Sequence, residues 1–204
     1  MNYKFLDFSI NKNIFQEKLD VPGAFLLHNL LTDKECQRII DHSEGIGYTM
    51  AKINNGAGKM VKRTQSRNSK RLILDVPEHS LQSLWSKLKD YLPETIVSGV
   101  RYHPTGLNPR LRMLRYHPGE YFAKHYDAGH NGSLMTLIVY LSDSFKGGAT
   151  RFYKGSREID SVTPKRGSAL LFFHDRHPLS PLHEGCPVKN GCKYAMRTDV
   201  YYST

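Results

Sequence analysis

The pattern of apolar and polar residues changes near Leu111. Upstream of this point, apolar residues recur at helical spacing in two segments. Downstream, they alternate with polar residues in short runs between glycine and proline turns. The downstream pattern predicts eight short strands. We place them at 111–117, 120–127, 134–141, 149–153, 158–163, 167–173, 179–184 and 192–202.

The first half of the chain predicts two helices and a short strand at 71–74. Thr32 and Glu35 have the spacing of a capping box, and the helix that it opens ends near Gly45. A second helix starts near Pro77 and stops at Pro93, because proline disrupts a helix interior. Its apolar residues fall on one stripe, which is most simply core packing. They are Leu81, Leu84, Trp85, Leu88 and Leu92.

This order of elements predicts an α+β, mainly β fold. We expect a double-sheet jelly roll, also called a double-stranded β-helix, with the N-terminal helices packed on one sheet as support. No repeat, low-complexity tract or linker interrupts the 204 residues. We therefore expect one domain over 1–204, with support from 1–100 and the jelly-roll core from 101–204. Such a barrel has a mouth in which side chains from distant strands converge.

Composition narrows the class of protein. The apolar content of 39% is ordinary for a globular domain. The three cysteines form no CxxC pair, which argues against a disulfide framework or a cysteine zinc site and favours a reducing compartment. Residues 1–7 lack a signal-peptide core, and no segment approaches the roughly 20 apolar residues of a membrane span. We expect a soluble, cytoplasmic protein without a membrane partner.

Much of the net charge of +10 lies between Lys52 and Arg71, a segment with seven basic and no acidic residues. Such a field attracts polyanions and acidic surfaces, although a solvated flexible loop is the equal alternative. The segment has no aromatic residue and therefore lacks the stacking surface of a single-strand nucleic-acid binder. Nucleic acid is accordingly a disfavoured partner.

The most informative residues are His125 and Asp127, with His183 far downstream. A His-x-Asp on a strand places both side chains on one face, because side chains alternate with period two. Two imidazoles and one carboxylate make the facial triad that suits non-haem Fe(II) with open positions. Three protein ligands with a bound water would instead make a hydrolytic zinc site, which stays an alternative at this point.

The context of these residues resembles a known family. Around them the sequence has RYHPG and HYD, YLSD, GGATRF, a proline-glycine run that ends in LLFF, and HEGCPVKNGCK. In type, order and spacing, this series from about Leu111 to Tyr202 resembles the prolyl 4-hydroxylase-like family of Fe(II)/2-oxoglutarate dioxygenases. The first 100 residues match much less closely.

The resemblance implies roles for individual residues. His125, Asp127 and His183 would hold Fe(II), and Tyr116 and Thr136 would face bound 2-oxoglutarate. Lys193 stands where relatives carry the cation that binds the distal carboxylate of 2-oxoglutarate, which weakens the zinc alternative. Arg197 lies on the same strand face and would bind a carboxylate bidentately, so the choice between the two cations stays open, as does a pairing of Arg197 with Asp127.

The implied reaction uses Fe(II), 2-oxoglutarate, O2 and L-ascorbate to hydroxylate a C–H bond, with release of succinate and CO2. The first expectation for the substrate is a prolyl residue of a peptide or protein, clamped in part by Arg67 and Asn68 under a loop at 52–71. Deletion of 54–62 would then raise the peptide KM. The alternatives are the same chemistry on another amino acid or a nucleic acid, and a metal-binding interaction module without activity. The sequence leaves the oligomeric state open.

Overall fold

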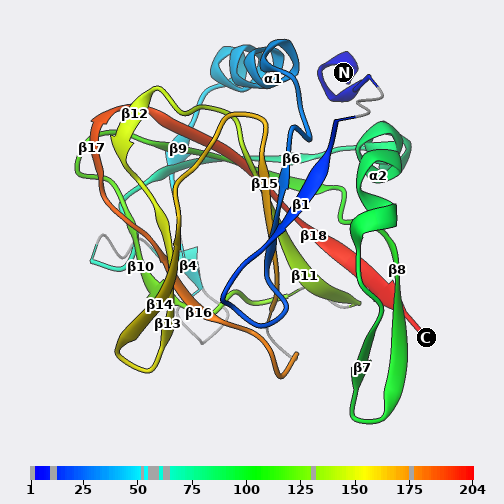
Figure 1. Cartoon of the computed structure of the whole chain (residues 1–204). Coiled ribbons are helices and arrows are strands. Elements are labelled where there is room, and N and C mark those ends of the chain that lie inside the picture. Colours follow the sequence, from blue (N-terminus) through cyan, green and yellow to red (C-terminus); the bar gives the residue numbers. More distant parts are fainter. Residues whose placement is uncertain are drawn as a thin grey trace.

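Two β-sheets lie face to face and form the centre of the molecule (Figure 1). We describe a computed structural model, which covers residues 3–9, 13–51, 53–54, 60–61, 65–129, 132–174 and 177–204. Side chains of both sheets meet between the layers in one apolar cluster, in which Phe172 of the larger sheet packs edge-to-face on Phe152 of the smaller sheet. The predicted mainly β jelly roll is therefore confirmed. Its description as a single domain stays a prediction.

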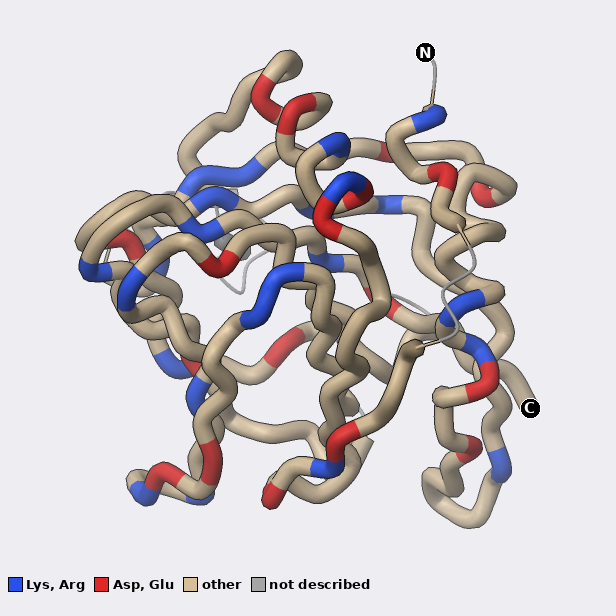
Figure 2. Tube along the Cα trace, turned by 45° about the horizontal axis from the view of Figure 1, so that its top comes forward, with Lys and Arg blue, Asp and Glu red and all other residues tan. Residues whose placement is uncertain are grey.

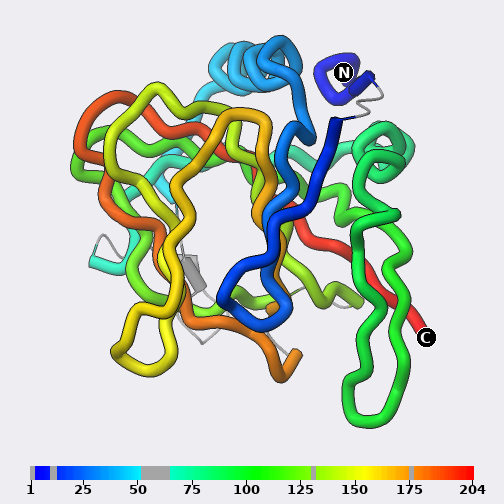
Figure 3. Tube along the Cα trace, in the orientation of Figure 1, coloured from blue at the N-terminus to red at the C-terminus, as the bar shows by residue number. Residues whose placement is uncertain are grey.

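The larger sheet has the order β1-β2-β15-β11-β18-β9-β6-β3, with β8 paired to β18 and β7 paired to β8. The N-terminal strand β2 lies beside β15, which the tube view shows as blue against orange (Figure 3). Strand β18 is long enough to pair with β9 along its first half and with β8 along its second. The strands are β1 (Phe15–Lys18), β2 (Phe25–His28), β3 (Thr49–Met50), β6 (Lys70–Asp75), β7 (Thr95–Val97), β8 (Val100–Leu107), β9 (Arg110–Tyr116), β11 (Ser133–Tyr140), β15 (Ala169–Phe173) and β18 (Lys193–Ser203).

The smaller sheet has the order β10-β16-β13-β14, and all its pairings are antiparallel. Its strands are β10 (Phe122–His125), β13 (Thr150–Lys154), β14 (Arg157–Val162) and β16 (Leu182–Gly185). Two further ladders join β12 (Phe145–Gly147) to β17 (Val188–Gly191) and β4 (Ile53–Asn54) to β5 (Met60–Val61). The smaller sheet therefore pairs strands that are far apart in the chain, such as β10 and β16.

The helices pack on the outer face of the larger sheet (Figure 1). Helix α1 (Asp33–Ile46) begins at the predicted capping box, since the Thr32 hydroxyl accepts from the Glu35 amide and the Glu35 carboxylate accepts from the Thr32 amide. Ile39 of α1 and Leu84 of α2 (Gln82–Leu88) share an apolar cluster with the side chains of β9, β11 and β18 that face the helices. None of the helices in the described residues is long and apolar enough to cross a membrane.

The second predicted helix is shorter than expected. Instead of one helix from Pro77 to Leu92, the 3-10 turns η2 (Glu78–Leu81) and η3 (Lys89–Tyr91) flank the seven-residue α2, and a third turn, η1 (Lys4–Leu6), lies near the N-terminus. The predicted leucine stripe is nevertheless buried, with Leu84 and Leu88 fully inaccessible. The pattern thus identified the buried face correctly, while the hydrogen bonding of the helix ends tightens to i,i+3.

Candidate active site

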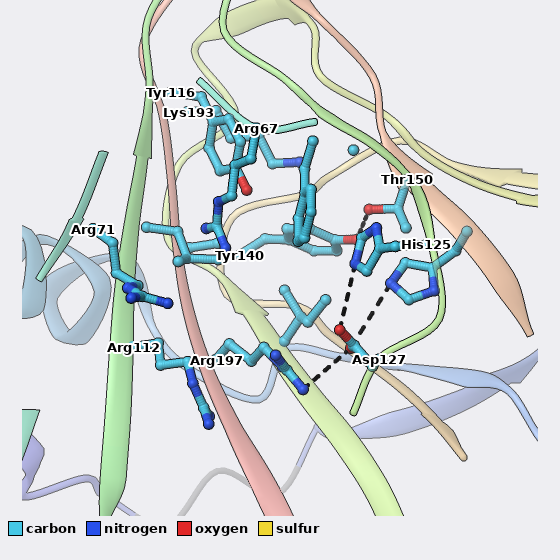
Figure 4. Close-up of a pocket in the computed structure, with 16 residues that line it drawn as sticks. Arg67, Arg71, Arg112, Tyr116, His125, Asp127, Tyr140, Thr150, Lys193 and Arg197 are labelled. Carbon is cyan, nitrogen blue, oxygen red and sulfur yellow. Dashed lines mark hydrogen bonds and ion pairs between the residues drawn. The ribbon is translucent and has the colours of Figure 1, made fainter. Parts of the chain in front are cut away.

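Three predicted ligand residues converge at one end of the smaller sheet. His125 is the last residue of β10 and lies directly opposite His183 of β16, while Asp127 follows two residues after β10. One ligand atom of each residue lies within 4.8 Å of the corresponding atoms of the other two. Figure 4 shows the His125 imidazole directed at the Asp127 carboxylate, and the Nε2 atom of His183 lies 3.8 Å from Asp127 Oδ2. The arrangement brings two nitrogens and one oxygen to a common point.

Backbone carbonyls fix the tautomer of both histidines. The Nδ1 atom of His125 lies 2.7 Å from the Ala123 carbonyl oxygen, and that of His183 lies 3.1 Å from the Pro181 carbonyl oxygen. A carbonyl only accepts hydrogen bonds, so Nδ1 carries the proton in each ring and Nε2 presents a lone pair toward Asp127. Burial lowers the pKa of His183 to about 4, which keeps this imidazole neutral at physiological pH.

Asp127 is held as a carboxylate. Burial would raise its pKa, but the positive charge of the Arg197 guanidinium opposes this effect, and the pKa lies well below its usual range. The Thr136 hydroxyl donates to Asp127 Oδ2 at 2.9 Å, and Arg197 lies 3.3 Å from the same oxygen. Two neutral imidazoles and one ionised carboxylate fit the requirements of a divalent iron with open positions.

Thr136 occupies a different place from the one expected. It was predicted to face 2-oxoglutarate, but its fully buried side chain lies behind Asp127 and does not line the cavity. Its hydroxyl donates to Asp127 and accepts from His174 Nδ1 at 2.9 Å. Thr136 is therefore placed to orient the carboxylate, and His174 is a supporting residue that sequence reasoning missed.

A lysine without a carboxylate partner lies deep in the cavity between the sheets. Lys193 is 5% exposed, and its ammonium group donates to the Gly148 carbonyl oxygen at 2.6 Å. The rings of Tyr116 and Tyr140 each lie 5.4 Å from its nitrogen. Burial lowers its pKa to about 8. A buried cation of this kind requires an anionic partner.

Polar groups accompany Lys193 at this end of the cavity. Tyr116 pairs directly with Lys193 across β9 and β18, as expected for a residue that faces the same ligand. The Tyr140 hydroxyl and the Thr150 hydroxyl lie 2.8 Å apart and also line the cavity. Sequence reasoning assigned no role to Tyr140 and Thr150, although both lie within the motifs that it quoted.

The structure distinguishes the two candidate cations. Lys193 and Arg197 share a strand face, but four residues of strand separate them by about 13 Å. Arg197 contacts Asp127 at 3.3 Å and Asp199 at 3.2 Å, which is the pairing with Asp127 considered from the sequence. Lys193 has no such carboxylate among the described residues. The cation that lacks a counter-charge is thus Lys193.

Arg67 and Asn68 differ in whether their side chains are free to contact a ligand in the cavity. Arg67 lines the cavity, with its guanidinium 4.5 Å from the centre of the Phe122 ring and its Nε donating to Ser69. The amide group of Asn68 is instead engaged by the neighbouring turn, since it donates to the Gly119 carbonyl and accepts from the Tyr121 amide. The predicted peptide clamp therefore retains Arg67 and loses Asn68. Part of the basic loop, including 55–59 and 62–64, lies outside the described residues.

Two further arginines line the cavity and were not predicted. Arg71 of β6 and Arg112 of β9 face inward beside Arg197 of β18 (Figure 4). The alternation along β9 contains a signal for Arg112, because Leu114 and Tyr116 follow it at period two on the same face. Arg71 depends on the pairing of β6 with β9, which one sequence does not reveal.

Comparison with known proteins agrees with this geometry. Residues 111–199 match the model of the 2OG-Fe(II) oxygenase superfamily. Prolyl 4-hydroxylase 2 of Arabidopsis thaliana is 28% identical over 223 residues, which cover 91% of this chain and 69% of that protein. The family resemblance found in the sequence is thereby confirmed.

Solved structures show the same fold. The viral collagen prolyl hydroxylase of Paramecium Bursaria Chlorella virus-1, in its 2OG complex, aligns with a TM-score of 0.63 and 22% identity over 92% of this chain and all of that one. A prolyl hydroxylase from Trichoplax adhaerens, in complex with a hypoxia inducible factor peptide fragment, aligns with a TM-score of 0.65 and 19% identity. The Trichoplax alignment covers 88% of this chain and 83% of the Trichoplax chain.

Proposed function

We propose that the protein hydroxylates a prolyl residue of a peptide or protein, because residues 111–199 match the model of the 2OG-Fe(II) oxygenase superfamily. The convergence of His125, Asp127 and His183 on one point, in a cavity that also contains Lys193, carries the proposal. The prolyl target is supported by the prolyl 4-hydroxylases among the relatives, and a peptide substrate by the peptide bound to the Trichoplax structure.

In this proposal, His125, Asp127 and His183 hold the iron. Iron bound there supplies the O2-dependent oxidation of a C–H bond, coupled to conversion of 2-oxoglutarate into succinate and CO2. With three protein ligands, a bound ion would keep open positions for co-substrates. Thr136 and Arg197 keep the Asp127 carboxylate in position, because both contact its Oδ2.

Lys193 binds the distal carboxylate of 2-oxoglutarate. Its ammonium is a buried cation without a carboxylate partner among the described residues, and the hydroxyls of Tyr116, Tyr140 and Thr150 line the same end of the cavity. A charge-assisted hydrogen bond between the lysine and the carboxylate would compensate the burial of both. Ascorbate serves to maintain the iron in its reduced state.

Aromatic side chains shield the reacting centre from water. The Phe122 ring stacks on His125 with the ring centres 3.6 Å apart, and Phe172 meets His183 edge-to-face at 4.6 Å. Leu114 and Ala195 form an apolar part of the wall between the two ends of the cavity. Exclusion of water strengthens the electrostatic interactions inside the site and protects reactive species from side reactions.

We also propose a cytoplasmic location. Cys36, Cys186 and Cys192 are all unpaired, which suits a reducing compartment.

Mass spectrometry of a prolyl peptide library tests the activity. The protein is incubated with Fe(II), 2-oxoglutarate and ascorbate in air, and each peptide is searched for the mass of one added oxygen atom while succinate is measured in parallel. We expect oxygen on proline and one succinate per hydroxylation. Oxygen on another residue would contradict the prolyl assignment, and no succinate from the iron-loaded protein with any substrate would contradict the enzymatic function.

A further inference from the structure

Four arginines surround the mouth side of the cavity. Arg112 and Arg197 are direct cross-strand neighbours on β9 and β18, and Arg71 lies diagonally from Arg112 on β6 (Figure 4). The guanidinium of Arg67 stacks on the Phe122 ring. Like charges directly opposite one another destabilise a sheet. The cluster therefore lowers the stability of the fold unless something compensates it.

Carboxylates of the protein compensate only part of this charge. Asp199 is fully buried and lies 3.3 Å from Arg112 and 3.2 Å from Arg197, which also contacts Asp127. Arg71 has no carboxylate partner among the described residues. Burial and the neighbouring arginines lower its pKa to about 10. In Arg67 one terminal nitrogen, and in Arg197 the Nε atom, are buried without a hydrogen-bond acceptor.

The excess charge persists when the proposed metal and co-substrate are bound. Among the described residues, Lys193 and the four arginines provide five positive charges, against the two negative charges of Asp127 and Asp199. A ferrous ion and a 2-oxoglutarate dianion cancel each other. Three positive charges thus remain in a partly desolvated space, where cations are costly without a counter-charge.

We propose that Arg71 and Arg112, with Arg67 beside them, form a subsite for a carboxylate that the substrate carries near its target residue. The inference rests on the proposed function and specifies its substrate as an acidic peptide. The carboxylate belongs either to an Asp or Glu side chain or to a free C-terminus. A planar guanidinium binds either one bidentately.

The arginine subsite is separate from the co-substrate pocket. Arg112 lies four residues before Tyr116 on β9, so about 13 Å of strand separates the arginine end of the cavity from the lysine end. Leu114 and Ala195 pair across β9 and β18 midway between these positions and line the wall between the two ends. One 2-oxoglutarate molecule at Lys193 therefore leaves the arginines available for a different anion.

Burial of the arginines favours a discrete carboxylate over a nucleic-acid backbone. Arg67 is 6% exposed and Arg112 is 9% exposed, so both groups lie inside the cavity rather than on the surface. The phosphates of a polymer are read mainly by exposed lysines and arginines. An acidic side chain or a C-terminus of a peptide is small enough to enter the cavity and reach the buried guanidinium groups.

Charge-matched peptides test the subsite. The probes are N-acetylated, C-amidated hexapeptides with one proline, in which Glu, Gln or Lys occupies each other position in turn, and a non-amidated set supplies the free C-terminus. Binding is measured without O2 on protein loaded with Fe(II) and 2-oxoglutarate, and hydroxylation is then measured in air. At one position or at the C-terminus, we expect the carboxylate peptide to bind about tenfold tighter than its neutral counterpart.

Variants separate the subsite from a general charge effect. Lysines and arginines are spread over most of the chain (Figure 2), so any acidic peptide is attracted to some extent. Arg71→Glu should abolish the preference for Glu and place the Lys peptide first, whereas Arg71→Lys should keep it. Arg157→Glu makes the same charge change at an exposed residue outside the cavity and should keep the preference.

Several outcomes overturn the inference. Equal binding of the Glu, Gln and Lys peptides at every position would do so, as would an equal loss of preference in Arg157→Glu and Arg71→Glu. Oxidation of an oligonucleotide in preference to every acidic peptide would do the same. Hydroxylation of neutral peptides in these cases would leave the proposed function intact. Conversely, a Glu preference in binding without hydroxylation of any peptide would contradict the proposed function and support the subsite.

Discussion

Arg112 and Arg197 face each other across β9 and β18, and their guanidinium groups contact opposite oxygens of the same Asp199 carboxylate. The pairing binds two cations to one buried anion. Arg71, diagonal to this pair, has no comparable partner in the described part of the chain. The arginines of the cavity therefore include two that are paired with Asp199 and one without a carboxylate partner among the described residues. Both features lead to effects on stability and binding that can be measured.

Neutralising Arg71 should stabilise the fold. Arg71→Gln removes a like-charge repulsion, and we expect a gain of about 0.5–1 kcal/mol in the free energy of unfolding. For a chain of this size, the thermal midpoint should rise by about 2 °C. Added sulfate should raise the midpoint of the wild type more than that of the variant. A midpoint lower than that of the wild type, with Arg157→Gln unchanged, would show that Arg71 stabilises the fold.

The affinity for 2-oxoglutarate should decrease at alkaline pH. Burial lowers the pKa of Lys193 from its usual value near 10.5 to about 8, so the free protein loses this cation above pH 8. A bound carboxylate favours the protonated form, and the dissociation constant should therefore rise about tenfold per pH unit above pH 8. Calorimetric titration between pH 7 and 9.5 measures this slope.

Lys193→Arg is the matched control for that titration. Arginine stays protonated over the whole range, so its profile should be flat even if its affinity differs. A flat profile in the wild type would mean that Lys193 stays charged without the co-substrate or that another group binds its carboxylate.

Thr136 should affect metal binding rather than binding of 2-oxoglutarate. Thr136→Val keeps the shape of the side chain but removes the hydroxyl that connects Asp127 to His174. Loss of such an outer partner typically weakens metal binding by about 10–100-fold. Competitive titration with Mn(II) measures the effect, and Thr136→Ser should retain most of the affinity. Unchanged Mn(II) affinity in the valine variant would refute the orienting role.

Removal of one proposed ligand should abolish turnover without unfolding the protein. His125 lies at the end of β10 and its side chain is partly exposed, so His125→Ala leaves the core of both sheets intact. We expect succinate release to fall to background while the far-ultraviolet circular dichroism stays unchanged. Turnover near the wild-type rate would remove His125 from the metal centre.

The strands after Leu111 could be predicted because each has one apolar and one polar side or clear turn residues at its ends. Strand β2 gave no such signal. Its four residues are all buried, since Leu26 packs between the sheets and Leu27 packs beneath the helices, so alternation is lost. Strand β8 was missed because Pro104 and Gly106 lie within it and resemble turn residues.

The site was predictable where its residues are close in sequence or belong to a motif. His125 and Asp127 share a local pattern, and Lys193 was reached through the family resemblance. Arg71 was not predictable, because its position in the cavity depends on the register between β6 and β9. The role of Thr136 is hard to predict for a related reason, since a strand residue can face a ligand or support the residue that binds it.

The two histidines of the proposed metal centre belong to the smaller sheet, whereas Lys193 and three of the four arginines belong to the larger one. Substitutions on the larger sheet at the positions of Arg71 and Arg112 can therefore alter which molecules are accepted without moving either imidazole. An enzyme built in this way can accept new substrates after single mutations and still retain its oxidative chemistry.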